Sequence, residues 1–386
     1  MINYGSHDIN KKDINLVVHA LKSKKITQGK FVVNFEESLK KKFNSKYACV
    51  VSNGSAALHL CCLAIDVRNS NVLLSSNTFL SEANAIIHAG GKPNFIDIDY
   101  DTGNISLKYL KKKIKQLKKK KEKISALIAT DYAGLPCNWK HLKKLSRKYK
   151  FKLINDNCHA IGAKYNDQFD YATRYADLVV HSYHPVKNIT TGEGGSILSN
   201  DKHYIEKIKI LRNHGLIKAK KEKLKNITWP FNQIYVGFNF RISDIQCALG
   251  ISQLKRLNIF LKKRTKIARN YDSFFKKYKS ISLQKIQKGI KHAYHLYVIK
   301  INFKKRQKIE LIRYFKKNKI MLQTHYYPIH HQPIYKKKLN FRENCKNSEK
   351  HFNNAISVPI YFNLKSKEQN KIINLFKNFF KRNNID

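Results

Sequence analysis

One lysine of this chain stands in a setting unlike that of the others. Lys187 follows a His-Pro pair and precedes threonines and glycines in "HSYHPVKNITTGEGGSILSND", residues 181–201, whereas most lysines here lie among other lysines. A lysine that attacks a carbonyl must be unprotonated part of the time, so an isolated lysine held beside a cofactor suits Schiff-base chemistry. In so basic a chain, an ordinary surface position is the simpler interpretation of any single lysine.

A carboxylate ends one of the most apolar segments. "FKLINDNCHAIGAKY" places Asp156 where a buried strand would end, and a carboxylate there is costly unless donors or a cation meet it. Such an aspartate commonly caps a loop. It also has the chemistry to pair with a protonated ring nitrogen, as in the partner of pyridoxal phosphate.

A turn of small residues precedes both Asp156 and Lys187 in the sequence. In "VVSNGSAALHLCCLAI" a strand breaks at Asn53 and Gly54, and an apolar helix begins near Ser55. A helix N-terminus offers free N–H groups and a positive dipole end, which suits a phosphate. An ordinary cap by Asn53 or Ser55 explains the turn equally well. Only the combination with Lys187 and Asp156 makes a cofactor site the preferred interpretation.

The secondary structure that positions these residues can be predicted between residues 47 and 200, where short apolar runs alternate with helical patterns. The runs are "YACVVS", "NVLLSS", "PNFIDI", "SALIATD", "FKLINDN", "DLVVHSY" and "GGSILSN". Strands buried on both faces give continuous apolar runs, so we predict a mainly parallel sheet covered by helices. Ligands of such sheets bind beyond the carboxyl ends of the strands, where these residues fall.

The chain is long enough for two domains. Residues 1–250 are predicted to form a large α/β domain, and residues 251–386 a bridging helix and a smaller α+β domain. Apolar residues at helical spacing in 243–275 predict the long bridging helix. The polar, basic segment 216–229 is expected to be an exposed excursion.

Lys and Arg outnumber Asp and Glu so strongly that the formal charge is +50. The basic residues are spread along the chain without a nucleic-acid recognition motif, so we expect no nucleic-acid partner. A basic nucleic-acid-binding protein built on an enzyme fold stays as an alternative. A surface this positive would attract anionic substrates, such as nucleotide-linked sugars, in either case.

Metal, disulfide and membrane features are not expected. The seven cysteines form no C-x-x-C pair and are odd in number, which favours a reducing, cytoplasmic setting. No segment reaches the roughly 18 apolar residues of a spanning helix. The histidines of "HYYPIHH", His325, His330 and His331, lack a nearby carboxylate or thiol in the sequence, so we predict no metal.

Several of these segments resemble motifs of the DegT/DnrJ/EryC1/StrS sugar aminotransferases. "SYHPVKNITTGEGGSILSND" is similar to the lysine motif of that family, "NDNCHAIGAKY" to its aspartate motif, and "NGSAALHL" to its phosphate turn. The resemblance extends from "INYGSHDINKKDI" to "HYYPIH" and so covers nearly the whole chain. It implies pyridoxal 5'-phosphate as the cofactor, bound to a large domain of the aspartate-aminotransferase fold type (fold type I).

The resemblance also implies roles for individual residues. Lys187 would be the catalytic residue that links to the cofactor and moves the proton, and Asp156 would keep the ring nitrogen protonated. The remaining cofactor-binding residues would be Gly54, Ser55, Ala56, Phe79, His159, Ser182, Asn239 and Arg241. The last two match a segment that reaches the phosphate of a partner subunit, which implies a homodimer. Tyr4, Thr27, His325 and His330 would contact the substrate.

We therefore expect an aminotransferase that moves the amino group of L-glutamate to the C4 keto carbon of a UDP-linked 4-keto-6-deoxy-N-acetylhexosamine, in pseudaminic-acid-type surface sugar biosynthesis. Another nucleotide-ketosugar, or amination at C3, stays open, because the residues that choose the sugar are not legible from motifs. The presence of Lys187, which some relatives replace by histidine to become dehydratases, argues for transamination.

Overall fold

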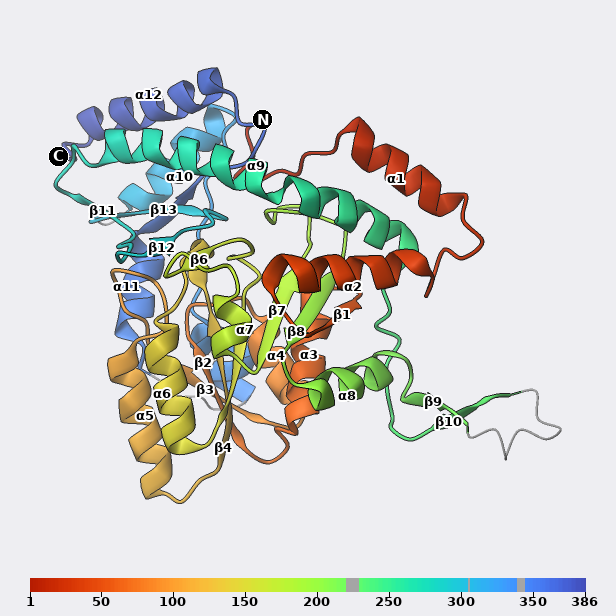
Figure 1. Ribbon diagram of the computed structural model, residues 1–386. Coiled ribbons are helices and arrows are strands. Elements are labelled where there is room, and N and C mark those ends of the chain that lie inside the picture. The colour runs from red at the N-terminus through yellow and green to blue at the C-terminus, as the bar shows by residue number, and fades with distance from the viewer. Residues whose placement is uncertain (220–228, 305, 339–343) are drawn as a thin grey trace.

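A computed structural model describes residues 1–386 apart from 220–228, 305 and 339–343. A seven-stranded sheet lies at the centre of the large lobe (Figure 1), in the order β1-β8-β7-β5-β4-β2-β3. All seven apolar runs of the sequence are strands of this sheet: β1 (Tyr47–Val51), β2 (Asn71–Ser75), β3 (Lys92–Ile96), β4 (Ile124–Thr130), β5 (Lys152–Asp156), β7 (Leu178–Ser182) and β8 (Gly195–Ser199).

The sheet is mainly parallel, as predicted. Strands β3, β2, β4, β5 and β7 pair in parallel, whereas β8 pairs antiparallel with both β7 and β1. Helices cover both faces, which is why the strands read as continuous apolar runs. One face packs against α2 (Lys30–Phe43), α5 (Leu107–Lys119), α6 (Trp139–Tyr149) and α7 (Tyr171–Tyr175), and the other against α3 (Gly54–Ile65), α4 (Ser81–His88) and α8 (Lys202–Arg212).

The long helix predicted from residue 243 is α9 (Asp244–Phe275). It begins with a capping box, in which Ser243 and Gln246 satisfy each other's backbone N–H groups. Figure 1 shows it running from the large lobe into a smaller one. There β11 (Ile281–Leu283), β13 (Tyr297–Ile301) and β14 (Ala355–Val358) form an antiparallel sheet, with α10 (Gln307–Lys317) and α12 (Ser366–Arg382) beside it.

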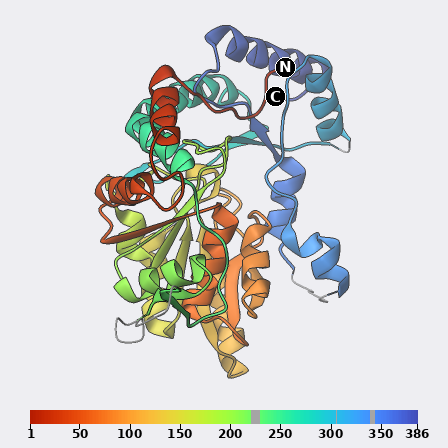
Figure 2. The ribbon, with the colours of Figure 1, turned by 90° about the vertical axis from the view of Figure 1, so that its right-hand side faces the viewer.

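The first residues of the chain lie beside the C-terminal lobe, as Figure 2 shows. Ile2 forms a parallel bridge with Ile320 and is buried in the hydrophobic cluster of that lobe. The predicted division of the chain into domains at residue 250 stays a prediction. The first residues of the segment 1–250 lie against the smaller lobe rather than within the large one.

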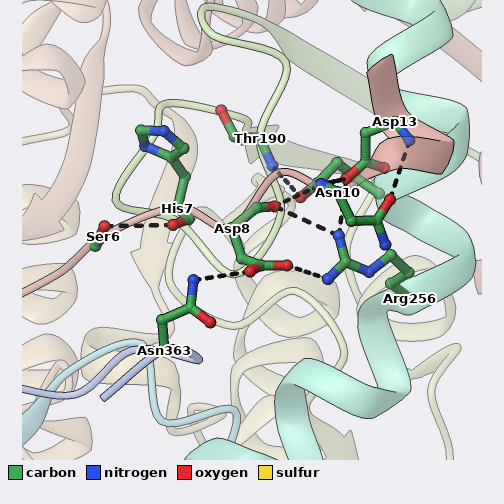
Figure 3. A network of polar contacts seen from close by, with 9 residues as sticks. Ser6, His7, Asp8, Asn10, Asp13, Thr190, Arg256 and Asn363 are labelled. Carbon is green, nitrogen blue, oxygen red and sulfur yellow. Dashed lines mark hydrogen bonds and ion pairs between the residues drawn. The ribbon is translucent and has the colours of Figure 1, made fainter. Parts of the chain in front are cut away.

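A polar network fixes the segment before α1 (Lys11–Leu21) against α9 (Figure 3). Asp8 accepts a hydrogen bond from Asn363 Nδ2 at 2.7 Å and forms an ion pair with Arg256. Arg256 Nη1 also lies 2.8 Å from Oδ2 of the buried Asp13. The network joins three distant parts of the chain and so holds the N-terminal segment, which carries Tyr4, in place.

The expected excursion at 216–229 falls largely outside the described residues. At its ends, β9 (Leu216–Lys218) and β10 (Phe231–Gln233) pair antiparallel, and Figure 1 shows these strands extending away from the body of the large lobe. Among the residues that the structure describes, none of the helices combines the length and the apolar character that a membrane span needs.

Candidate active site

A cavity of about 620 Å³ opens at the carboxyl ends of the parallel strands. This volume lies within the range of roughly 300–1,000 Å³ that is typical of small-molecule sites. Nine of the residues singled out from the sequence line it: Tyr4, Gly54, Ser55, Phe79, Asp156, His159, Ser182, Lys187 and His325. The cavity is therefore the place at which the predicted chemistry can be examined.

Lys187 lies in a loop that its neighbours hold firmly. Asn188 donates from Nδ2 to the carbonyl oxygen of Ala293 at 3.2 Å, and the Thr190 hydroxyl donates to that of Tyr183 at 2.9 Å. Burial lowers the pKa of the Lys187 amine, an effect that the charge of Asp156 only partly opposes. A larger fraction of the amine is thus unprotonated and able to act as a nucleophile or base.

Asp156 is buried at the end of β5, and its side chain reaches the cavity wall. The Cys158 N–H donates to Oδ1 at 2.9 Å, which fixes the carboxylate orientation. Strands β4 and β7, on either side of β5, are both parallel to it, so their ends meet at the same edge. Asp156 and Lys187 consequently share one cavity, as the cofactor interpretation requires.

The N-terminus of α3 lies at another wall of the cavity. Gly54 and Ser55 line it, and first-turn N–H groups have no acceptor within their own helix. The N–H of Ala56 instead donates to the Asn53 side chain at 2.8 Å. The ordinary cap considered from the sequence is thus present. It leaves the first two residues of the helix to face an anion.

Close packing around this turn leaves no room for larger residues. A Cβ on Gly54 would lie 3.0 Å from the Cβ of Ser182, and one on Gly195 would lie 2.6 Å from the carbonyl carbon and oxygen of Asn53. Glycine at these positions lets β8, β7 and the start of α3 approach one another. The Ser182 side chain is thereby brought beside the helix N-terminus.

His159 is held by two hydrogen bonds in the cavity wall. The Ala133 N–H donates to Nδ1 at 3.2 Å, and the phenol oxygen of Tyr326 lies 2.9 Å from Nε2. Because Nδ1 accepts, the ring proton resides on Nε2. Burial lowers the pKa of His159 well below its usual value, and the nearby charge of Lys187 lowers it further. His159 is thus a neutral donor to Tyr326.

Aromatic side chains close the other side of the cavity. Phe79 is 53% exposed, and its ring lies 5.9 Å from that of Tyr326 between centroids. Phe79 is therefore available to a ligand rather than packed in the core. The rings of Tyr4 and His325 lie 5.2 Å apart.

Five residues singled out from the sequence do not line this cavity: Ala56, Thr27, Asn239, Arg241 and His330. Thr27 is exposed and bridges Ser243 at the start of α9. Asn239 is exposed as well, and Arg241 donates to Asn213 at 2.7 Å. Within one chain, the structure does not bring these residues to the cofactor cavity.

His330 belongs to a different cluster. The Nε2 atoms of His330 and His331 lie 3.2 and 3.0 Å from the same oxygen of Glu349, which comes from α11 (Lys346–Asn354). The sequence showed no carboxylate near these histidines, and folding supplies one. These three side chains could hold a metal ion. They also satisfy one another without it, since each neutral histidine can donate to the carboxylate.

Sequence reasoning missed several residues of the site region. Tyr326, His295 and Thr130 line the cavity, and the ring of His295 lies 4.4 Å from that of His159. Glu82 is fully buried and bound to Thr130. Two signals were available: Thr130 directly ends an apolar run, and Glu82 is an acidic residue among small apolar ones in "SEANAIIHAG".

These residues fit pyridoxal phosphate. The helix N-terminus and the Ser182 hydroxyl would hold the phosphate group, Asp156 would pair with a cationic ring nitrogen, and the desolvated Lys187 would meet the aldehyde. A Cβ on Gly195 would lie 2.6 Å from the Asn53 backbone, so this side of the cradle requires glycine, and the space beside Gly54 is tight. The donor set is that of a cofactor-dependent amino-group transfer site.

Comparison with known proteins agrees with this description. Residues 7–377 match the DegT/DnrJ/EryC1/StrS aminotransferase family, so the chain belongs to that family. It is 38% identical over 370 residues to the UDP-4-amino-4,6-dideoxy-N-acetyl-beta-L-altrosamine transaminase of Campylobacter jejuni subsp. jejuni serotype O:2, covering 95% of this chain and 94% of the relative. The resemblance seen in the motifs is confirmed.

Solved structures show the same similarity. Helicobacter pylori PseC, an aminotransferase involved in the biosynthesis of pseudoaminic acid, superposes with a TM-score of 0.89 at 29% identity, covering 99% of each chain. Spr1654 of Streptococcus pneumoniae in its PLP form superposes with a TM-score of 0.88 at 25% identity, covering 98% of each chain. The predicted fold class is confirmed.

Proposed function

We propose that this chain is a pyridoxal-phosphate-dependent aminotransferase that moves the amino group of L-glutamate to the C4 keto carbon of a UDP-linked 4-keto-6-deoxy-N-acetylhexosamine. The observation that carries the proposal is the meeting of Lys187, Asp156 and the N-terminus of α3 in one cavity. The transaminase names of relatives such as the Campylobacter enzyme support this sugar substrate. Pseudaminic-acid-type surface sugar biosynthesis is the corresponding role.

Each group of the cavity then has a task. Pyridoxal phosphate, when bound, supplies an electron sink for the carbon that gains or loses the amino group. Asp156 holds the proton on the ring nitrogen, and the helix N-terminus with Ser182 binds the phosphate. The Lys187 amine takes and returns the proton at the reacting carbon, a task that its lowered pKa favours.

His159, Phe79 and Tyr326 shape the cavity around the ring. Neutral His159 would add no positive charge to a site that holds a cationic ring, and exposed Phe79 would offer that ring a flat apolar surface. Tyr4 and His325 enclose the opening on the side of the smaller lobe and are proposed to contact the sugar. The basic surface attracts the UDP diphosphate.

We further propose a homodimer in which Asn239 and Arg241 complete the partner's phosphate site. Both lie outside their own chain's cavity, on a stretch that follows β10. The neighbouring Tyr235 and Val236 are exposed to 43% and 89%, as is expected of apolar residues that a second subunit covers.

The visible absorption spectrum tests the first step. With pyridoxal phosphate, the protein should show a lysine-dependent band that L-glutamate bleaches, and Lys187→Ala should lack the band. Lys111→Ala on the exposed surface of α5 is the matched control and should behave as the parent. Product analysis with UDP-linked ketosugars then tests the substrate and the carbon aminated. Appreciable transamination by Lys187→Ala would overturn the assignment.

A further inference from the structure

A second carboxyl group lies behind Asp156. Glu82, in the first turn of α4, has no exposed surface. Its Oε1 accepts a hydrogen bond from the Thr78 hydroxyl at 2.7 Å and another from Thr130, whose hydroxyl lies 2.8 Å from that of Thr78. Two threonines thus hold one oxygen of this carboxyl in a fixed position.

The register of the sheet brings Glu82 against Asp156. Thr130 on β4 is the direct partner of Asp156 on the parallel strand β5, so both side chains project from the same face. Because Thr130 binds the Glu82 carboxyl and stands directly opposite Asp156 in the sheet, the Glu82 carboxyl lies beside the Asp156 side chain, whose charge acts on it. Two buried carboxyl groups therefore meet at the edge of the proposed cofactor cavity.

The surroundings decide how many protons this pair holds. No donor within the described part of the chain reaches Oε2 of Glu82, although that oxygen is buried. A negative charge there would be uncompensated, whereas a protonated oxygen could donate to Asp156. Burial and the Asp156 charge both raise the pKa of Glu82 well above its usual value.

The other titratable groups around Glu82 are thiols. Cys62 on α3, Cys137 after η1 (Tyr132–Gly134) and Cys158 after β5 lie near enough for a charge on Glu82 to act on their thiols. Burial raises the pKa of each thiol, that of Cys62 to about 12, so the thiols are neutral and offer Glu82 no positive partner. On the Asp156 side, Lys187 is a basic group whose pKa the Asp156 charge raises.

We propose that Glu82 is a positioning residue for Asp156: as a neutral carboxylic acid it donates its proton in a hydrogen bond to the Asp156 carboxylate and holds that carboxylate toward the cavity. The role of Asp156 rests on the proposed function. The pair then carries a single negative charge, which matches a single cationic ring nitrogen. If both carboxyl groups were ionised, the pair would carry two negative charges, and one of them would have no positive partner on the ring.

Infrared spectroscopy of the cofactor-free protein tests the protonation without relying on the enzyme reaction. The difference spectrum between the parent and Glu82→Gln should contain the C=O band of one protonated carboxylic acid. Asp156→Asn should shift that band, because an amide is a weaker acceptor than a carboxylate. Glu37→Gln, at an exposed ion pair of α2, is the control and should show no such band.

The pH dependence of unfolding gives a second readout. A carboxyl pKa raised on folding means that the folded state holds more protons, so stability falls as pH rises above the ordinary value of 4.5. Glu82→Gln should lack this loss, so its denaturation midpoint should rise relative to the parent as pH increases. Glu37→Gln should follow the parent at every pH.

The affinity for pyridoxal phosphate tests whether the Glu82–Asp156 pair contributes to the proposed cofactor site. Glutamine keeps an acceptor for the threonines and a donor for Asp156, whereas leucine keeps neither. Glu82→Leu should therefore bind pyridoxal phosphate at least about tenfold more weakly by equilibrium dialysis, and Glu82→Gln should restore most of the binding. This rescue distinguishes a hydrogen-bonding role from simple filling of space.

Three results would overturn the proposal. These are the absence of the carboxylic-acid band, a band that Asp156→Asn leaves unmoved, and equal cofactor binding by the leucine and glutamine variants. If the band and its shift are present but the parent protein does not bind pyridoxal phosphate, the proposed function fails while the shared proton stands. The two failures are thus distinguishable.

Discussion

The phenol oxygen of Tyr326, from the C-terminal part of the chain, lies 2.9 Å from Nε2 of His159 at the end of the central sheet. The contact fixes the tautomer of His159, because Nδ1 already accepts the Ala133 N–H. It also links the C-terminal part of the chain to the end of the central sheet across the cavity. A histidine held in this way is a neutral side chain with a fixed orientation, and it does not act as a base that titrates near pH 7.

The first prediction concerns this histidine. Since burial lowers its pKa well below the usual value, His159 should stay neutral with its proton on Nε2 throughout pH 6–8. Nitrogen-15 NMR of labelled histidine would show this tautomer directly. Exposed His184 serves as the internal comparison. A His159 signal that titrates within this interval would contradict the assignment.

The second prediction concerns the cost of keeping Lys187 at the cavity wall. Folding at pH 7 must either bury its ammonium group or release its proton, and both cost free energy. Because folding lowers the pKa from its ordinary value of 10.5, stability should rise with pH up to that value. Lys187→Met should be more stable than the parent at pH 7 and flatter with pH in denaturant titrations. Its transamination rate should fall by at least about a thousandfold.

The control for that experiment is Lys111→Met. This lysine is exposed on α5, so its replacement should change neither the pH dependence nor the rate. A Lys187→Met protein with the parent's pH dependence would mean that the amine is not desolvated by folding.

The third prediction tests the cradle beside α3. In Gly195→Ala the new methyl would lie 2.6 Å from backbone atoms of Asn53, so the turn that presents Gly54 must move. We expect the affinity for pyridoxal phosphate to fall about tenfold or more, equivalent to roughly 1.4 kcal/mol. Gly192→Ala meets no atom within 4 Å and tests backbone strain alone, since its φ is +80°. Equal losses in both variants would argue against the cradle.

The fourth prediction concerns Asp131, a buried carboxylate next to the site. It accepts hydrogen bonds from the Cys137 N–H, the Trp139 indole, the Asn157 amide and the Tyr171 hydroxyl, at 2.7 to 3.0 Å. Asp131→Asn places an NH₂ group against donors, so it should cost about 2–4 kcal/mol of unfolding free energy. Tyr171→Phe, which removes one donor, should cost less, and urea titrations would rank the two.

Much of the fold was predictable because its signals are local. Seven apolar runs became the seven strands of the sheet, since burial on both faces leaves no room for polar alternation. Lys187 and Asp156 were recognisable for the same reason. Asp156 ends such a run and Lys187 follows another, and the ends of parallel strands meet at one edge.

What could not be predicted depends on contacts between distant segments. Nothing in the sequence near His330 indicates Glu349, and nothing near Asp156 indicates Glu82. Both partners are brought in by the packing of separate helices against the sheet. Asn239 and Thr27 lie outside the cavity of their own chain, so a motif alone did not reveal which surface they serve.

The bridge between Ile2 and Ile320 bears on biosynthesis. The segment after Ile2 carries Tyr4 to the cavity, and the segment after Ile320 carries His325 and Tyr326 to it. During synthesis from the N-terminus, Tyr4 must therefore wait until Tyr326 has left the ribosome before this cavity can close. The central sheet can fold earlier, whereas any ligand binding that needs the closed cavity is expected only after Tyr326 has been added to the chain.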